Sequence, residues 1–387
     1  MSTRSVVIVG AGVAGWRAAR DLRGAGFEGS VTVVGDEPPY DRPPLSKQYL
    51  AGEFDDARIS LYRGGEPDSL NVEVRQERVA FVRPGAVTLE GGEEVAADEV
   101  VVATGSAARR PAILDGHDIL TLRTREDAQA IRAELENAES LLVLGGGFIG
   151  VEVAATARQA GLAVTIVEAQ PTLLGAALGA ECGERVERIH RDHGVELITG
   201  VGVERIEAAD GGAVVVLADG RELTADLAVA GFGAELNLDV FDGLDLNLSN
   251  GVRCDEFGRV EGLDGVWAAG DIAAWHDPVT GEAIRREHWQ VAGEQASIVA
   301  RTIAGVEIVK RNPPYFWSDQ FDVKVQVFGR PELADSRGWL EADDLDPESV
   351  WAFRRGENLV GVVTFGVPRL LGRFRPLVVE GLAAATA

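Results

Sequence analysis

The stretch Val6-Val7-Ile8-Val9-Gly10-Ala11-Gly12-Val13-Ala14-Gly15 joins an apolar run to a GxGxxG pattern, and residues 141–150, Leu-Leu-Val-Leu-Gly-Gly-Gly-Phe-Ile-Gly, repeat it. In this pattern the first glycine allows a tight turn from strand to helix, and the second lets backbone amides approach a pyrophosphate. The third lets helix and strand pack closely, and the helix directs its N-terminus at the phosphates. A single copy can be an ordinary turn, but two copies predict that one polypeptide binds two dinucleotides.

An acidic residue follows each glycine pattern near the end of a second predicted strand. Asp36 comes after Val31 to Val34, and Glu168 comes after Val164 to Val167. A carboxylate in this place accepts hydrogen bonds from ribose hydroxyls. Acids in both copies favour two nucleotide sites over two accidental glycine turns.

The two copies also continue alike, each through a glycine-punctuated hairpin into a last strand that ends in glycine. In the first copy these segments are Val79 to Val82, Ala86 to Leu89 and Asp98 to Gly105. In the second they are Val203 to Ile206, the turn Asp210-Gly211-Gly212, Val214 to Leu217 and Asp226 to Gly233. We therefore predict an α/β fold with two Rossmann-like dinucleotide-binding domains that arose by internal duplication.

The remaining chain completes the first fold and adds a small domain. The strand Gly265 to Ala268 ends in Ala269-Gly270-Asp271, and a helix is predicted from Glu287 to Gly305. Pro313-Pro314 marks a boundary, after which three strands are predicted: Val323 to Val327, Val350 to Arg354 and Leu359 to Phe365. We expect a small C-terminal α+β domain with an antiparallel sheet. The alanine-rich end after Glu380 is either a short helix or a frayed tail.

Composition and charge bound the classes of protein that this chain can be. Its 387 residues, 46% of them hydrophobic, are enough for two or three well-buried domains. A formal net charge of −25 opposes binding to nucleic acid or to anionic membrane surfaces. The sequence offers no export pattern and no apolar run of the roughly twenty residues that a spanning helix needs, so we expect a cytoplasmic protein.

Cysteine and histidine spacing gives no sign of a metal site. Cys182 and Cys254 lie in different units of the chain and form no CxxC pattern, so we interpret both as inert thiols. His190 and His193 share a charged helical stretch, which favours a solvated helix face over a zinc site.

Several segments together resemble FAD-dependent pyridine-nucleotide oxidoreductases. Besides the two glycine patterns they are Arg42-Pro43-Pro44-Leu45-Ser46-Lys47, Ala103-Thr104-Gly105 and Ala269-Gly270-Asp271. Within that superfamily, three segments are similar to bacterial ferredoxin reductases of the putidaredoxin reductase type: Pro44-Leu45-Ser46-Lys47, Ile149-Gly150-Val151-Glu152 and Phe316-Trp317-Ser318-Asp319-Gln320. The resemblance covers nearly the whole chain, and the first and last of these segments are more specific than the glycine patterns.

The resemblance implies a domain plan and two cofactors. Residues 1–109 and 235–309 would form a discontinuous FAD-binding domain, 110–234 an NAD-binding domain, and 310–387 a C-terminal interface domain. The implied FAD contacts are Gly10, Gly12, Ala14, Gly15, Asp36, Arg42, Lys47, Val79, Thr104, Gly105, Arg123, Gly270, Asp271 and Trp289. The implied NAD contacts are Gly145, Gly147, Ile149, Gly150, Glu152, Glu168, Gly231 and Gly233.

The resemblance also implies a reaction, in which NADH passes hydride to FAD and a 2Fe-2S ferredoxin then receives single electrons. Lys47 is expected to form an ion pair with Glu152 at the flavin, and Trp317 to lie between flavin and docked ferredoxin. Glu168 predicts NADH rather than NADPH, because a 2′-phosphate would meet a carboxylate. Since the chain is acidic, a ferredoxin would need a local basic patch, for which Arg285, Arg286, Lys310 and Arg311 are candidates.

Two alternative functions stay open at this point. Rubredoxin reductases are similar in sequence and differ mainly in their acceptor, and a redox-sensing flavoprotein resembling apoptosis-inducing factor would use NADH to change its association. Disulfide reductase chemistry is disfavoured, because the first cysteine of the chain is Cys182. We expect a monomer or a weak homodimer.

Overall fold

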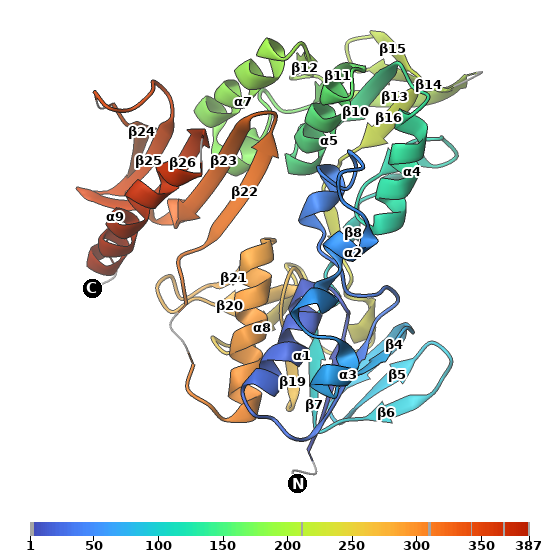
Figure 1. Ribbon diagram of the computed structural model, residues 1–387, viewed down its shortest axis with the longest axis vertical. Helices are drawn as coiled ribbons and strands as arrows, with labels where there is room; N and C mark the ends of the chain where they lie inside the picture. Colours follow the sequence, from blue (N-terminus) through green and yellow to red (C-terminus); the bar gives the residue numbers. More distant parts are fainter. Residues whose placement is uncertain (1–3, 210–211, 309–310, 342, 367, 386–387) are drawn as a thin grey trace. The chain divides into compact units, whose positions relative to one another are not determined.

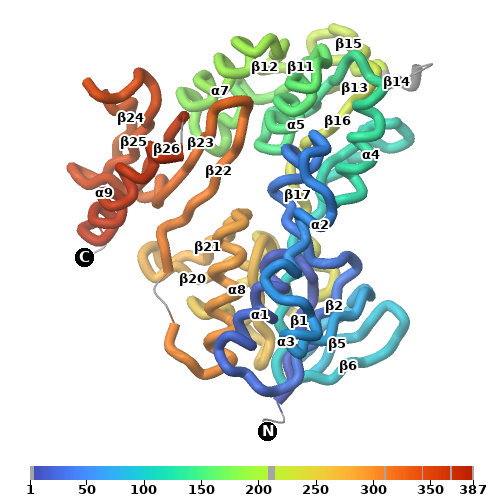
Figure 2. Tube along the Cα trace, in the orientation of Figure 1, coloured from blue at the N-terminus to red at the C-terminus, as the bar shows by residue number. Residues whose placement is uncertain are grey.

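The computed structural model describes residues 4–209, 212–308, 311–341, 343–366 and 368–385. Its chain divides into two compact units, each assembled from segments that are distant in the sequence (Figure 1, Figure 2). Unit 1 contains Met1–Asp41, Ile59–Ala107 and Glu235–Asn312. Unit 2 contains Arg42–Arg58, Ala108–Ala234 and Pro313–Ala387. Each of the two predicted nucleotide folds therefore has its glycine pattern in a unit of its own.

Unit 1 is built on a parallel sheet whose central strand leads into the first glycine pattern. The strand order is β19 (Val266–Ala268), β7 (Glu99–Val102), β1 (Ser5–Val9), β2 (Ser30–Val34) and β3 (Glu73–Arg75). The inner strands are continuous runs of buried apolar residues, as sheets covered on both faces require. Helices α1 (Val13–Gly24) and α8 (Trp289–Ala304) pack against each other. The predicted helix from Glu287 thus begins at Trp289.

Unit 2 contains a second parallel sheet with the same arrangement around the second glycine pattern. Its strand order is β12 (Glu196–Thr199), β11 (Ala163–Glu168), β10 (Ser140–Leu144), β16 (Leu227–Ala230) and β9 (Leu120–Thr121). Its helices include α4 (Arg125–Leu135), α5 (Phe148–Gln159) and α7 (Ala180–Asp192). The two five-stranded parallel sheets confirm the α/β prediction.

The duplication extends to single hydrogen bonds at the start of the central strands. The Ser5 amide and hydroxyl both donate to the Asp98 carboxylate, at 2.6 and 2.9 Å. The Ser140 amide and hydroxyl donate in the same way to Asp226, at 2.9 and 2.8 Å. In each unit this serine–aspartate pair joins the first strand of the repeat to the last, which supports the internal duplication.

The predicted hairpins are part of three-stranded antiparallel sheets. These sheets are β4 (Val79–Arg83), β5 (Ala86–Leu89) and β6 (Glu94–Ala96) in unit 1, and β13 (Val203–Ala209), β14 (Gly212–Leu217) and β15 (Glu222–Ala225) in unit 2. Asp210 and Gly211 of the predicted turn lie outside the described residues. The third strand of each sheet was not predicted from the sequence.

The C-terminal part of unit 2 is an antiparallel sheet with one long helix. Its order is β22 (Tyr315–Gln320), β23 (Val323–Gly329), β26 (Asn358–Gly366), β25 (Val350–Arg355) and β24 (Ser336–Trp339). Helix α9 (Arg369–Ala385) packs on β26 and β23 (Figure 1). The alanine-rich end is therefore helical up to Ala385, and the predicted antiparallel α+β arrangement is confirmed.

Shorter elements connect these layers. They are η1 (Pro43–Ser46), α2 (Asp56–Ile59), η2 (Leu61–Gly64), α3 (Pro67–Leu70), β8 (Ser106–Ala108), η3 (Ala112–Leu114), α6 (Gly175–Leu178), β17 (Ala234–Leu236), η4 (Asp239–Phe241), β18 (Val252–Cys254), β20 (Ala273–His276), β21 (Ala283–Arg285) and η5 (Pro331–Leu333). Within the described ranges, no helix is both long and apolar enough to cross a bilayer.

The segment Arg42–Arg58 belongs to unit 2 although it follows the first repeat in the chain. The Tyr49 hydroxyl donates to the Asp56 carboxylate at 2.5 Å and accepts from the Gln129 amide of α4 at 2.8 Å. The Arg125 guanidinium adds an ion pair to Asp56 at 3.2 Å. These long-range contacts group the segment with the second nucleotide fold, whereas our division into three domains was drawn from sequence order and stays a prediction.

The structure corrects our interpretation of His190 but not that of His193. His190, on α7, is fully buried against the end of β22, and its Nε2 lies 3.3 Å from Gln320 Oε1. His193 is exposed, as a solvated face predicts, although its ring stacks on Phe321 with centroids 3.9 Å apart. The charged residues around His190 suggested a solvated position, but the C-terminal sheet packs on this side of α7. Among the described residues, no cluster could hold a metal ion.

Burial of His190 predicts a loss of stability in acid. Desolvation, together with the nearby His193, lowers the pKa of His190 from 6.5 to about 4. As the pH falls, His190 therefore takes up a proton in the unfolded chain before it does so in the folded protein. The stability contributed by neutral His190 is lost as the pH falls from 6.5 towards 4. The loss reaches about 3 kcal/mol. In denaturant unfolding at pH 7, 5.5 and 4, a His190→Asn variant should lose less stability on acidification than the parent. Equal losses in the two proteins would contradict this assignment.

Candidate active site

The first glycine pattern forms a turn that only glycine can adopt. Gly10 has a φ of +102°, and a Cβ there would lie 2.3 Å from the carbonyl oxygen of Ala103. A Cβ on Gly15 would lie 1.8 Å from the carbonyl oxygen of Gly10. The turn between β1 and α1 is thus packed backbone against backbone, as the sequence predicted.

The second pattern repeats this geometry. Gly145 has a φ of +110°, and a Cβ there would lie 2.4 Å from the carbonyl oxygen of Gly231. A Cβ on Gly150 would lie 2.1 Å from the carbonyl oxygen of Gly145. The two turns are therefore equivalent in the contacts that require glycine.

Both turns leave backbone donors available for a phosphate. Gly12 is the N-cap of α1 and Gly147 is the N-cap of α5, and neither helix has a side-chain hydrogen bond at its cap. Neither helix has an acidic residue in its first turn. Unpaired amides and the positive end of the helix dipole suit a pyrophosphate, so both sites fit a dinucleotide.

The two predicted ribose-binding acids are not at equivalent positions. Glu168 is the last residue of β11, and its carboxylate accepts from the Gly146 amide at 2.6 Å and the Gln170 amide at 2.7 Å. The equivalent position in the first repeat is Gly35, where a Cβ would lie 2.8 Å from the Ala11 amide nitrogen. Asp36 is therefore one residue further on and largely exposed, with its carboxylate 3.8 Å from Arg78 Nε.

In unit 1, the residues after β7 and β19 form a polar group at the carboxyl ends of these strands. The Thr104 hydroxyl donates to the carbonyl of Asn237 at 2.7 Å, and the Asn237 amide donates back at 2.9 Å. The Ser106 hydroxyl donates to Asp271 at 2.8 Å, which fixes the carboxylate predicted to bind the ribityl chain. The Gly270 amide donates to the buried Gln295 side chain at 2.9 Å.

The other predicted contacts lie at the ends of elements. Trp289 is the first residue of α8, with 40% of its surface exposed, and its indole N–H donates to Asp41 at 2.9 Å. The remaining positions are Arg42 at the N-cap of η1, Val79 at the start of β4, Ala14 and Ile149 in the first turns of α1 and α5, Gly105 after β7, Arg123 before α4, and Gly231 and Gly233 after β16. Their contacts to FAD or NAD stay a prediction.

In unit 2, three segments converge on the buried carboxylate of Glu152, in the second turn of α5. The Lys47 ammonium lies 2.9 Å from Glu152 Oε2, and both side chains are about nine-tenths buried. The Ser46 hydroxyl donates to the same oxygen at 2.5 Å, and the Ser318 hydroxyl donates to Oε1 at 2.6 Å. The predicted Lys47–Glu152 ion pair is confirmed, and its placement at the flavin remains a prediction. We call Ser46, Lys47, Glu152 and Ser318 the Glu152 cluster.

The cluster explains why three separate motifs occur in one chain. Ser46 and Lys47 end the Pro-Leu-Ser-Lys segment, Glu152 follows the second glycine pattern, and Ser318 lies in the Phe-Trp-Ser-Asp-Gln segment. Sequence reasoning selected Lys47 and Glu152 but missed both serines. The available signal was their place inside the two most family-specific segments.

Trp317 lies on β22, next to Ser318. Its ring is half-buried and stacks on Tyr315, with centroids 5.8 Å apart. Its indole N–H donates to Asp319 at 3.2 Å, and the Lys324 ammonium lies 5.6 Å from the ring centroid. The residue is therefore a partly accessible aromatic side chain held by its strand neighbours.

Two of the cations in the predicted basic patch are engaged within unit 1. Arg285 donates to Asn250 and to the carbonyl of Asp271, and it forms an ion pair with Glu287. Arg311 donates to the carbonyl of Glu256 and lies over Trp275, and burial lowers its pKa. Lys310 lies outside the described residues. Arg285 and Arg311 are therefore not free cations, and the basic patch as a whole stays a prediction.

Both cysteines are buried and free. Burial raises the pKa of Cys182 to about 12 and the pKa of Cys254 above the usual range. They belong to different units, and neither is a thiolate near neutral pH. The interpretation as inert thiols is consistent with these facts.

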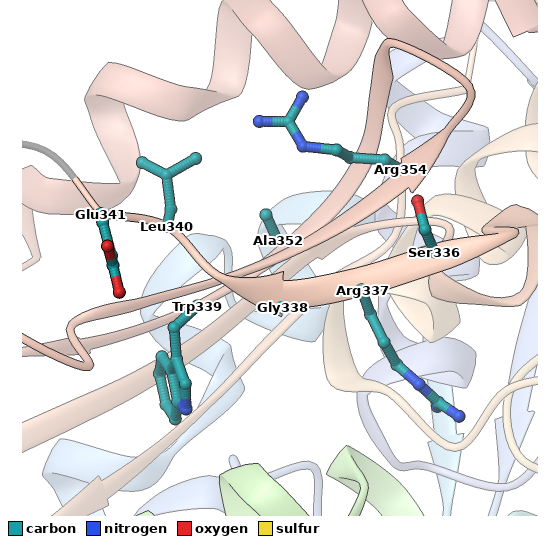
Figure 3. Close-up of a pocket in the computed structure, with 8 residues that line it drawn as sticks. All are labelled: Ser336, Arg337, Gly338, Trp339, Leu340, Glu341, Ala352 and Arg354. Atoms are coloured by element: carbon teal, nitrogen blue, oxygen red, sulfur yellow. The ribbon is translucent and has the colours of Figure 1, made fainter.

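A pocket of about 330 Å³ runs along β24 but does not form a candidate site (Figure 3). In the β24–β25 register Arg354 pairs with Ser336, whereas Arg337 pairs with Phe353. The two arginine side chains therefore leave opposite faces of the sheet, as Figure 3 shows. The pocket contains none of the predicted site residues.

Two dinucleotide cradles, the glycine turns at residues 10–15 and 145–150, together with the Glu152 cluster on the helix of the second, define an oxidoreductase that binds two nucleotide cofactors. Residues 4–296 match the family model "Pyridine nucleotide-disulphide oxidoreductase", and residues 315–387 match "Reductase C-terminal". The chain belongs to the pyridine nucleotide-disulphide oxidoreductase family. This membership implies FAD and NADH as cofactors.

Relatives of known activity match almost the whole chain. Rhodocoxin reductase from Rhodococcus erythropolis is 35% identical over 383 residues, covering 94% of this chain and 87% of that protein. The ferredoxin–NAD(+) reductase component of the p-cumate 2,3-dioxygenase system from Pseudomonas putida is 34% identical over 371 residues, covering 94% and 90%. The crystal structure of the covalent putidaredoxin reductase–putidaredoxin complex is similar with a TM-score of 0.92 and 29% identity, covering 100% of this chain and 96% of that chain.

Proposed function

We propose that the protein is an NADH-dependent ferredoxin reductase that supplies electrons to a 2Fe-2S ferredoxin serving an oxygenase. The observation that carries the proposal is the Glu152 cluster, because it joins the helix of the second cradle to the two segments typical of bacterial ferredoxin reductases. The ferredoxin–NAD(+) reductases among its relatives support the reaction, and the similar reductase–putidaredoxin complex supports a ferredoxin partner. We also propose that it acts in the cytoplasm.

The chain's own residues bind and orient the cofactors. The amides at the start of α1 would hold the FAD pyrophosphate, and those at the start of α5 would hold that of NADH. Asp271, oriented by Ser106, would accept a hydrogen bond from the ribityl chain. FAD supplies the chemistry that accepts a hydride and releases electrons singly.

Within this proposal Lys47 stabilises negative charge on the reduced cofactor. Its ammonium is fixed by Glu152 and has two further N–H donors, so it can place a positive charge where the reduced cofactor carries negative charge. Trp317, which directly precedes Ser318 on β22, would lie between the cofactor and the ferredoxin that accepts the electrons. Neither role requires a proton to move between these residues.

An anaerobic experiment tests the proposed function. NADH added to the purified yellow protein should bleach the flavin absorbance at least as fast as the enzyme turns over in the steady state. Cytochrome c reduction should then depend on added 2Fe-2S ferredoxin. Turnover with rubredoxin but not with ferredoxin would assign the alternative acceptor. Slow bleaching without acceptor-dependent turnover would favour a redox-sensing flavoprotein and contradict the proposal.

The place of Glu168 predicts a strong preference for NADH. The backbone amides of Gly146, in the second glycine turn, and of Gln170 hold its carboxylate, and a 2′-phosphate would meet it there as a like charge. The catalytic efficiency with NADH should therefore exceed that with NADPH on the order of a hundredfold. Glu168→Gln should reduce this ratio, because it weakens the binding of NADH and removes the charge repulsion that opposes the binding of NADPH. Steady-state kcat/KM measurements with both coenzymes check this, and similar efficiencies in the parent protein would refute it.

A further inference from the structure

Strand β22 presents two chemically different faces, because successive residues of a strand point to opposite sides. One face packs against the nucleotide fold of unit 2 through three successive contacts. These are the Phe316 ring against Phe148 at 5.2 Å, the Ser318 hydroxyl to Glu152 at 2.6 Å, and Gln320 Oε1 to His190 Nε2 at 3.3 Å. The strand is thereby attached to helices α5 and α7.

The opposite face carries Trp317 between Tyr315 and Asp319. The indole stacks on Tyr315 and donates to Asp319, which forms an ion pair with Lys324. These partners lie on β22 and β23, so they hold the indole on the strands. A shift of β22 on α5 would therefore carry Trp317 with it.

The Ser318–Glu152 bond is the polar contact that sets the position of β22 on α5. It is a short hydrogen bond to a carboxylate, the donor is fully buried, and the acceptor is itself held by Lys47. Among the described residues, β22 is the edge strand of its sheet and pairs with β23. Because this backbone ladder runs to β23 and not to α5, side-chain contacts determine where the strand lies on the helix.

We infer that Ser318 is a positioning residue that holds Trp317 in place for electron delivery by anchoring β22 to Glu152. The inference rests on the proposed function, because electron delivery presupposes a ferredoxin acceptor. Through the Ser318 hydroxyl, the Lys47–Glu152 ion pair is connected to the strand that carries Trp317. Ser318 itself transfers neither protons nor electrons.

The test compares Ser318→Ala and Ser318→Thr in the holoprotein. Removal of the hydroxyl should lower the ratio of ferredoxin-dependent turnover to the rate of flavin reduction by NADH about tenfold, whereas threonine retains the bond and should restore most of it. In a Trp317→Phe background the same Ser318→Ala change should have little further effect, because the residue acts through the indole. Equal effects in the two backgrounds would overturn the inference.

Hydrogen exchange gives a second readout that needs no turnover. The amides of residues 316–320 should exchange faster in Ser318→Ala, with and without FAD, and return to the parent rate in Ser318→Thr. Ser46→Ala is the matched control, because it removes a hydroxyl from the same carboxylate without touching β22, and it should leave this exchange as in the parent. Unchanged exchange in Ser318→Ala would refute the anchor. Failure of the proposed function would instead show in the parent protein, as flavin reduction without ferredoxin turnover.

Discussion

Glu152→Gln is expected to lower the free energy of unfolding by about 3–5 kcal/mol, because it leaves the Lys47 ammonium buried without a counter-charge. The amide group retains nearly the same volume, so the loss comes from charge and hydrogen bonding and not from a cavity. The variant should also slow flavin reduction by NADH. Urea unfolding at a fixed FAD concentration measures the stability, and stopped-flow absorbance measures the rate.

Lys47→Met, which removes the other partner of the ion pair, provides the control. It leaves the Glu152 carboxylate with two hydroxyl donors, Ser46 and Ser318, so we expect it to cost less than about 2 kcal/mol. The double variant should be more stable than Glu152→Gln alone, since no unpaired charge remains. If Lys47→Met is the more damaging single change, or if it alters neither reduction rate nor midpoint potential, the assigned roles of the pair are wrong.

The features that the sequence predicted well are those whose signal is local. A Cβ cannot fit at Gly15 or Gly150, so the pattern of small residues there records a backbone contact within one turn. Strand prediction also succeeded where buried apolar runs were bounded by glycine. Glu168 could be placed because it ends such a run, and its partners are the Gln170 amide two residues on and the Gly146 amide of the same repeat.

What sequence reasoning missed depends on contacts between distant segments. His190 was interpreted as solvated because its neighbours are charged, yet the strand that buries it lies far along the chain. Asp36 was taken as equivalent to Glu168, although the close approach of Ala11 excludes any side chain at Gly35. Arg285 and Arg311 of the predicted patch likewise have partners that their spacing does not reveal. Ser46 and Ser318 required knowledge of which motifs meet.

Alanine at the third glycine of each cradle should impair the binding of one cofactor at a time, FAD in Gly15→Ala and NADH in Gly150→Ala. Gly15→Ala is expected to give a protein without bound FAD, because the new methyl would lie 1.8 Å from the Gly10 carbonyl and force the β1–α1 turn to shift. Gly150→Ala should give a yellow protein that binds NADH on the order of a hundredfold more weakly, since a shift of about 1 Å at a binding turn has effects of that size. Absorbance spectra of the purified variants and NADH titrations measure the two losses.

Two controls distinguish loss of a cofactor site from loss of the fold. Gly24→Ala lies near the end of α1, where a Cβ meets nothing within 4 Å, so FAD content and stability should match those of the parent. At Gly147 a Cβ also meets no protein atom, yet the methyl would occupy the space through which the helix N-terminus approaches a pyrophosphate. Gly147→Ala should therefore fold normally and still bind NADH weakly. Retention of FAD by Gly15→Ala, or unaltered NADH binding by both Gly147→Ala and Gly150→Ala, would show that these turns do not hold the two pyrophosphates.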